Sequence, residues 1–185
     1  MQTSQSIDLE DRLRERLKGK VLLVGIGNTL RGDDGLGPKI IEALDGKVQA
    51  ELLDVGEVPE SYTGRIISVR PDTIVLIDAV DFGGAPGSAV FLNAGEMAAR
   101  FPQISTHKIS LSVLAQWAEA NGTTRVWLLG VQPESLKSQQ QLTPTLQNTL
   151  ELLCDLLKTG TDRVGTGVLA HPCRAKLGSE LEVNA

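Results

Sequence analysis

Residues 21–37 read Val-Leu-Leu-Val-Gly-Ile-Gly-Asn-Thr-Leu-Arg-Gly-Asp-Asp-Gly-Leu-Gly, and this stretch decides the fold. Its first four residues form an unbroken apolar run, which is typical of a strand buried on both faces. The apolar residues that follow have helical spacing; they are Leu36, Ile40, Ile41 and Leu44. A helix over 35–46 that stops at Gly46 is therefore predicted. A strand, a glycine-rich loop and a helix in this order indicate an α/β protein with a parallel sheet.

Two acidic residues, Asp33 and Asp34, stand where this helix is expected to begin. Ligands of open parallel sheets bind outside the carboxyl ends of the strands, which is where this loop lies. An Asp at a helix start also commonly accepts hydrogen bonds from the first N–H groups, a cap that contributes about 0.5–2 kcal/mol. From the sequence, capping and ligand binding are both open for each residue.

Nucleotide binding is a second interpretation of the glycine-rich loop. Gly25 and Gly27 follow a strand, and Asp54 ends the next expected strand, where an acid can contact a ribose. The dinucleotide fingerprint, however, requires its third glycine where this chain has Leu30. Two acidic side chains at the end of the loop would also repel a pyrophosphate. The loop therefore fits a cation or a proton better than a nucleotide.

Four more strands are expected, over 48–54, 73–80, 88–92 and 125–131. The segment 88–92 follows a tight turn rather than a crossover helix, so we expect an antiparallel edge strand. Further helices are expected over 8–18, near 66–69, over 111–121 and over 143–160. The sequence thus predicts a single three-layer α/β domain whose five-stranded, mostly parallel, twisted sheet lies between helices.

Three segments are expected: an N-terminal extension over 1–19, the α/β domain over 20–160 and a flexible C-terminal tail over 161–185. In the extension, Leu9, Leu13 and Leu17 make only a narrow apolar stripe. We therefore expect its short helix to lie on the surface or to fray. The tail has no apolar period and is rich in small and polar residues.

Length, charge and cysteine content exclude several classes of protein. The chain has 185 residues, 41% of them apolar, and a net charge of −5, which suits one domain with a substantial core. The absence of a basic run argues against a nucleic-acid partner. Residues 1–18 are polar and charged, and no apolar run reaches membrane length, so we expect neither a signal peptide nor membrane insertion. Cys154 and Cys173 form no spacing motif, which fits a reducing cytoplasm.

Polar side chains also mark the other two buried strands. Asp78 stands inside the apolar run 73–80, where a carboxylate is costly unless it is paired or ligating. Asp81 follows three residues later and fits a turn. Gln132 stands just beyond the strand expected over 125–131.

His107 stands just before a predicted helix, where a lone histidine is usually a capping or surface residue. If the strand ends converge on one cleft, Asp34, Asp78 and His107 meet there. Two carboxylates and one imidazole are a coherent ligand set for a divalent ion, with positions left open. Such a set should bind weakly unless other ligands complete it.

With these residues in place, the sequence resembles the nickel–iron hydrogenase maturation endopeptidases from about residue 20 to 158. The motifs that carry the resemblance are Gly27-Asn28, Gly32-Asp33-Asp34-Gly35-x-Gly37, Asp78-Ala79-x-Asp81, Thr106-His107 and Gly130-Val131-Gln132-Pro133. Each motif is short, but the set in this order is specific. The pattern looks closest to the branch that processes formate-hydrogenlyase-type hydrogenase, where Asp holds the position of Asp34.

The resemblance implies a protease that removes the C-terminal extension of the hydrogenase large-subunit precursor after nickel insertion. It implies metal contacts from Asp34, Asp78 and His107, with Asp34 and Asp78 as catalytic candidates. The supporting residues it implies are Asn28, Gly32, Asp33, Asp81 and Gln132. In this family the nickel is thought to be supplied by the precursor, so no stable metal of the protease's own is expected.

Two other functions stay open at this point. One is a metal-independent acid protease with paired carboxylates. The other is a non-enzymatic module that binds a nucleotide or a metal at the strand ends. A covalent route has no support, because the other histidine and the other cysteine outside the expected core, His171 and Cys173, lie in the tail.

Overall fold

A computed structural model gives the fold of the protein, and the residues that it describes are 3–100, 111–120 and 122–162. It contains a five-stranded sheet in the order β2-β1-β3-β5-β4. The strands are β1 (Val21–Ile26), β2 (Glu51–Gly56), β3 (Thr73–Ala79), β4 (Ala89–Asn93) and β5 (Arg125–Val131). The pairings of β1 with β2, β1 with β3 and β3 with β5 are parallel, and β4 pairs antiparallel with β5 at the edge. The predicted fold class is therefore confirmed.

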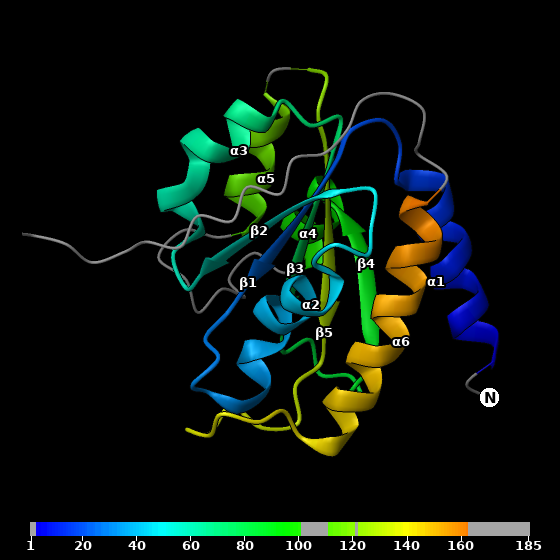
Figure 1. Cartoon of the computed structure of the whole chain (residues 1–185), viewed down its shortest axis with the longest axis vertical. Coiled ribbons are helices and arrows are strands. Elements are labelled where there is room, and N and C mark those ends of the chain that lie inside the picture. The colour runs from blue at the N-terminus through cyan, green and yellow to red at the C-terminus, as the bar shows by residue number, and fades with distance from the viewer. Residues whose placement is uncertain (1–2, 101–110, 121, 163–185) are drawn as a thin grey trace, which may run out of the picture.

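Helices cover both faces of the sheet and complete three layers (Figure 1). They are α1 (Thr3–Arg16), α2 (Leu36–Leu44), α3 (Thr63–Val69), α4 (Ala94–Arg100), α5 (Leu111–Glu119) and α6 (Pro144–Thr161), with short 3-10 helices η1 (Gly32–Gly35) and η2 (Pro59–Tyr62). One apolar core lies between the sheet and α1, α2 and α6. A second lies between the opposite face and α3, α4 and α5. Burial on both faces explains why β1 and β3 read as continuous apolar runs.

Glycines let helix α2 lie directly on the backbone of the sheet. A Cβ at Gly37 would lie 2.4 Å from the carbonyl oxygens of Ile26 and Ile77. A Cβ at Gly25 would lie 2.6 Å from the carbonyl oxygen of Gly37. No side chain fits at either position, so these two glycines of the loop motif serve helix–sheet packing.

Helix α1 packs into the core, which differs from the surface position expected for it. Leu13 and Leu17 are 0% and 1% exposed and belong to the core beneath α6. The guanidinium groups of Arg12 and Arg16 lie 5.7 and 5.4 Å from the ring centroids of Phe91 and Trp127. The narrow leucine stripe is enough to hold α1 against the core, because arginine side chains of the same helix also contact aromatic rings of the sheet.

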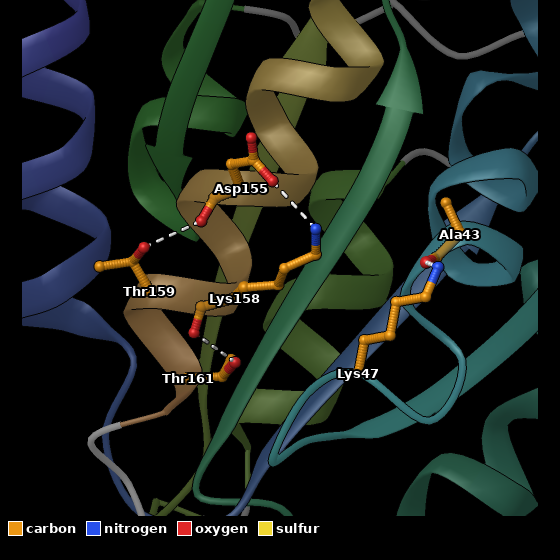
Figure 2. Close-up of polar contacts among 6 residues, drawn as sticks. All are labelled: Ala43, Lys47, Asp155, Lys158, Thr159 and Thr161. Carbon is orange, nitrogen blue, oxygen red and sulfur yellow. Dashed lines mark hydrogen bonds and ion pairs between the residues drawn. The ribbon is translucent and has the colours of Figure 1, made fainter.

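Two other elements differ from the sequence prediction. Helix α4 (Ala94–Arg100) was not predicted, because it is short and buries mainly Ala94 and Met97. Helix α6 runs one residue beyond the expected stop and includes Thr161, which is fully buried. Figure 2 shows this end, where the Thr161 hydroxyl donates to the Lys158 carbonyl oxygen at 3.2 Å. Asp162 caps the end of α6, and the expected tail from residue 163 onward lies outside the described residues.

No helix within the described ranges is long and apolar enough to cross a lipid bilayer. Cys154, on α6, is a buried free cysteine of the apolar core. Burial raises the pKa of its thiol, so it is a poor nucleophile.

Candidate functional site

The loops that follow β1, β3 and β5 meet at the carboxyl edge of the sheet. Helix η1, which carries Asp33 and Asp34, packs beside β3, near whose end Asp78 stands. All three carboxylates are buried, at 0%, 4% and 4% exposure. The structure thus places Asp33 and Asp34 on η1 and Asp78 on the adjacent strand β3.

Asp33 ties the loop after β1 to the loop before α6. Its carboxylate accepts hydrogen bonds from the N–H groups of Glu134 and Ser135, both at 2.9 Å. It also accepts from Thr143, through the N–H at 2.7 Å and the hydroxyl at 3.1 Å. Four donors satisfy the carboxylate, and Thr143 itself caps α6. Asp33 therefore joins two loops through hydrogen bonds, which we call the Asp33 clamp, and it does not cap its own helix.

Gly32 lets this clamp form. Its φ is +56°, a left-handed conformation that favours glycine. Its N–H donates to the Gln139 carbonyl oxygen at 2.7 Å, and a Cβ would lie 3.0 Å from the Ser135 carbonyl oxygen. The predicted supporting role of Gly32 thus has a backbone reason in the structure.

Asp34 is held differently, by the main chain of the same loop. The Asn28 N–H donates to its Oδ2 at 2.9 Å. The Asn28 side chain fixes that turn, because its Oδ1 accepts from the Leu30 N–H at 2.8 Å and its Nδ2 donates to Glu57 at 2.9 Å. Gly27 is also required, since its φ is +133° and a Cβ there would lie 1.8 Å from the Asp34 carbonyl oxygen. The loop therefore places Asp34 at a fixed position.

Asp78 occupies the end of the central strand β3, opposite Gly130 of β5. Strand alternation puts it on the same face as Ile74 and Leu76, the face covered by α3, α4 and α5. The residue that pairs with Asp78 has no side chain, and the side chains of Val90 and Val80 lie 3.2 and 3.5 Å from where a Cβ of Gly130 would stand. A buried carboxylate in this place is costly unless a cation or a donor compensates it.

Gln132 organises the turn that follows β3. Its Nε2 donates to Asp81 Oδ1 at 3.0 Å, and its Oε1 accepts from the N–H groups of Phe82 and Gly84 at 2.9 and 3.1 Å. The pKa of the Asp81 carboxyl is lowered by the hydrogen bond from Gln132 and then by that from the Gly83 N–H. Asp81 is exposed, so we assign both residues to support of the loop.

The third predicted ligand, His107, lies outside the described residues, so its position relative to Asp34 and Asp78 stays a prediction. Within the described ranges, no three His, Cys, Asp or Glu side chains are grouped so as to hold a metal ion. The described part of the chain thus supplies two carboxylates of the predicted set.

A cavity of about 200 Å³ opens at the ends of β1 and β2, next to the turn that holds Asp34. Its lining includes Asn28, Thr29, Asp54 and Glu57. Sequence reasoning considered Asp54 only as a ribose contact and did not single out Glu57. Glu57 lies in the loop after β2, and β2 pairs with β1. Glu57 could not be singled out from the sequence, because the sequence does not show which strand pairs with β1.

Comparisons with known proteins agree with this architecture. The family model described as hydrogenase maturation protease matches residues 38–159. The hydrogenase 3 maturation protease of Escherichia coli is 30% identical over 152 residues, which cover 80% of this chain and 96% of that relative.

Solved structures of such proteases are also similar. The NiFe hydrogenase maturation protease HycI from Thermococcus kodakarensis KOD1 has a TM-score of 0.73 at 30% identity, covering 83% of this chain and 97% of that one. The hydrogenase maturating endopeptidase HybD from Escherichia coli has a TM-score of 0.67 at 28% identity, covering 79% and 94%.

Together, the sheet, its carboxyl-edge acids and these matches define a peptidase with an α/β fold. The chain belongs to the hydrogenase maturation protease family.

Proposed function

We propose that this peptidase removes the C-terminal extension of a nickel–iron hydrogenase large-subunit precursor after nickel has been inserted. The observation that carries the proposal is the pair of buried carboxylates at the carboxyl edge, Asp34 on η1 and Asp78 near the end of the adjacent strand β3. Membership of the maturation protease family gives the substrate class. Asp at position 34 fits the formate-hydrogenlyase-type branch, and two cysteines without a spacing motif fit a cytoplasmic reaction.

In this proposal, nickel belongs to the substrate. Asp34, Asp78 and His107 contact the ion that the precursor already holds. Two carboxylates and one imidazole leave coordination positions open, and the soft thiolates of the precursor's own site are the natural ligands for them. Cleavage then occurs only when the metal bridges both proteins, so nickel insertion acts as a checkpoint.

The same carboxylates supply the chemistry of the cut. Bound nickel fixes the precursor, which brings its scissile bond near the carboxyl edge. Asp34 or Asp78 then orients or deprotonates the attacking water. Asn28 serves this step by fixing one oxygen of Asp34 through its N–H. Cys154 takes no part, because it lies on the buried face of α6, in the apolar core.

The test mixes the purified protein with nickel-loaded precursor and, separately, with metal-free precursor at the same concentration. Mass spectrometry is expected to show loss of the C-terminal extension from the loaded precursor alone. Mature large subunit, which lacks the extension, is the control for other cleavage. Equal rates on both precursors would contradict the checkpoint and favour a metal-independent carboxylate mechanism. Failure to cut either would contradict the proposed substrate.

A further inference from the structure

Strand β2 ends in a bulge beside the loop that follows β1. The register of the two strands is regular up to Gly25, which lies opposite Asp54. The next residue of β1, Ile26, lies opposite Gly56, so β2 contains one extra residue, Val55. The φ of Gly56 is +56°, a left-handed conformation that favours glycine. Because a bulge bends its strand, it re-aims the side chain that follows, and bulges are over-represented next to active sites.

After the bulge, the end of β2 contacts the loop after β1 at two points. The Gly27 N–H donates to the Gly56 carbonyl oxygen at 2.9 Å. The Asn28 Nδ2 donates to Glu57 Oε2, also at 2.9 Å. Hydrogen bonds to an ionised acceptor are stronger than those between neutral groups, so the Glu57 carboxylate holds the Asn28 amide more firmly than a neutral acceptor would.

Asn28 transmits this contact to Asp34. Its side chain is bonded at both ends, because Nδ2 donates to Glu57 and Oδ1 accepts from the Leu30 N–H at 2.8 Å. Its main-chain N–H donates to Asp34 Oδ2 at 2.9 Å. Two hydrogen bonds made by one residue therefore connect Glu57 to the Asp34 carboxylate.

The contact between Glu57 and Asn28 adds little to stability, but it lies where the precursor is expected to bind. Glu57 is exposed, and holding an exposed glutamate in one rotamer costs side-chain entropy that offsets much of the hydrogen bond. Both residues line the cavity of about 200 Å³ at the ends of β1 and β2. We propose that Glu57 is a positioning residue that fixes the Asp34 carboxylate through Asn28, a role that rests on the proposed function of Asp34 in cleavage.

The first test measures the kinetics of cleavage of nickel-loaded precursor by variants of the full chain. Because a slightly misplaced catalytic group slows a reaction strongly, Glu57→Ala is expected to lower kcat by about 10–100-fold with little change in KM. Glu57→Gln keeps an oxygen that accepts from Asn28 Nδ2, so it is expected to restore most of kcat. Glu42→Ala, at an exposed glutamate of α2, is the matched control and is expected to cleave normally. Normal kcat in Glu57→Ala, or equal losses in the Ala and Gln variants, would overturn the proposal.

A double-mutant cycle tests whether Glu57 acts through Asn28. If it does, Asn28→Ala combined with Glu57→Ala is expected to lose no more kcat than Asn28→Ala alone. Losses that multiply in the double variant would show that Glu57 acts independently of Asn28, and the proposal would be wrong.

The last test is NMR of the protein without precursor, which does not depend on proteolytic activity. Glu57→Ala is expected to shift the resonance of the Asn28 N–H, whose acceptor is Asp34 Oδ2, whereas Glu42→Ala is expected to leave it in place. An unmoved Asn28 resonance in Glu57→Ala would contradict the transmission from Glu57 to Asp34. Failure of the native protein to cut any precursor would instead contradict the proposed function, and the NMR comparison would still decide whether Glu57 positions Asp34.

Discussion

The regions around Asp33 and Asp34 are neighbours in the chain but are built differently. Asp33 faces the loop before α6, where four donors from Glu134, Ser135 and Thr143 surround its carboxylate. Asp34 faces the carboxyl edge beside β3, and the hydrogen bond described for its carboxylate comes from the Asn28 N–H. Both are buried, so burial does not distinguish a structural acid from a functional one. The two carboxylates differ in the number of donors that the fold supplies to them.

The largest effect is expected on the Asp34 side. Asp34→Asn and Asp78→Asn keep the shape of the side chains and remove their charge. Loss of a general base or ligand is expected to lower the cleavage rate by about 10²–10⁴-fold, while the melting temperature stays near that of the native protein. Asp155→Asn, an exposed acid on α6, is the control and is expected to cleave normally. Normal cleavage by a folded Asp34 or Asp78 variant would remove that residue from the mechanism.

On the Asp33 side, the expected loss is in stability. Asp33→Ala removes the acceptor of three buried or partly buried N–H groups, and each unsatisfied group costs about 1–3 kcal/mol. Denaturant unfolding is expected to show a loss of roughly 3 kcal/mol or more, with Asp33→Asn intermediate. An Asp33→Ala protein that is as stable as the native one but inactive would place Asp33 in the chemistry, and the comparison would fail.

Gly27 tests whether the turn that holds Asp34 depends on a close backbone approach. Gly27→Ala is expected to lose stability for two reasons: the backbone conformation has a positive φ, and the added Cβ would lie 1.8 Å from the Asp34 carbonyl oxygen. Gly46→Ala is expected to lose stability only through its positive φ of +69°, because no atom lies within 4 Å of the added Cβ. We expect Gly27→Ala to lose about 1–3 kcal/mol more stability than Gly46→Ala. Equal losses would show that the loop moves freely.

The smallest effect is expected at the exposed turn after β3. Gln132→Ala removes the first cause of the lowered pKa of Asp81, so that pKa should rise toward its ordinary value. Because folding lowers this pKa, the contribution of Asp81 to stability is present above the unfolded pKa of about 3.9 and is lost as pH falls through the folded pKa. NMR titration of the carboxyl group in both proteins measures the shift. An unchanged pKa would mean that the Gly83 N–H alone holds Asp81.

Much of the fold was predictable from local patterns. The apolar runs of β1, β3 and β5 and the turn before β4 appear in consecutive residues, so their identity and the antiparallel edge followed from the sequence. The role of Asp33 did not, because its partners Glu134 and Thr143 are 101 and 110 residues away. The burial of α1 was missed for a related reason, since its leucines pack against α6, which comes more than 100 residues later in the chain. Local patterns reveal elements, whereas the partners of a buried acid depend on the tertiary fold.

The place of β4 at the sheet edge has a consequence for how the protein is made. β4 is synthesised before β5, yet β5 lies between it and the rest of the sheet. Until β5 leaves the ribosome, β4 has no strand to pair with. The carboxylate of Asp33 likewise lacks its hydrogen bonds from Thr143 until that residue, 110 positions later, has been synthesised. At about 5–20 residues per second, this wait lasts roughly 5–20 s. The carboxyl edge thus acquires its loop before α6 only after Thr143 has been synthesised, although β1, β3 and the loop that carries Asp33 are made much earlier.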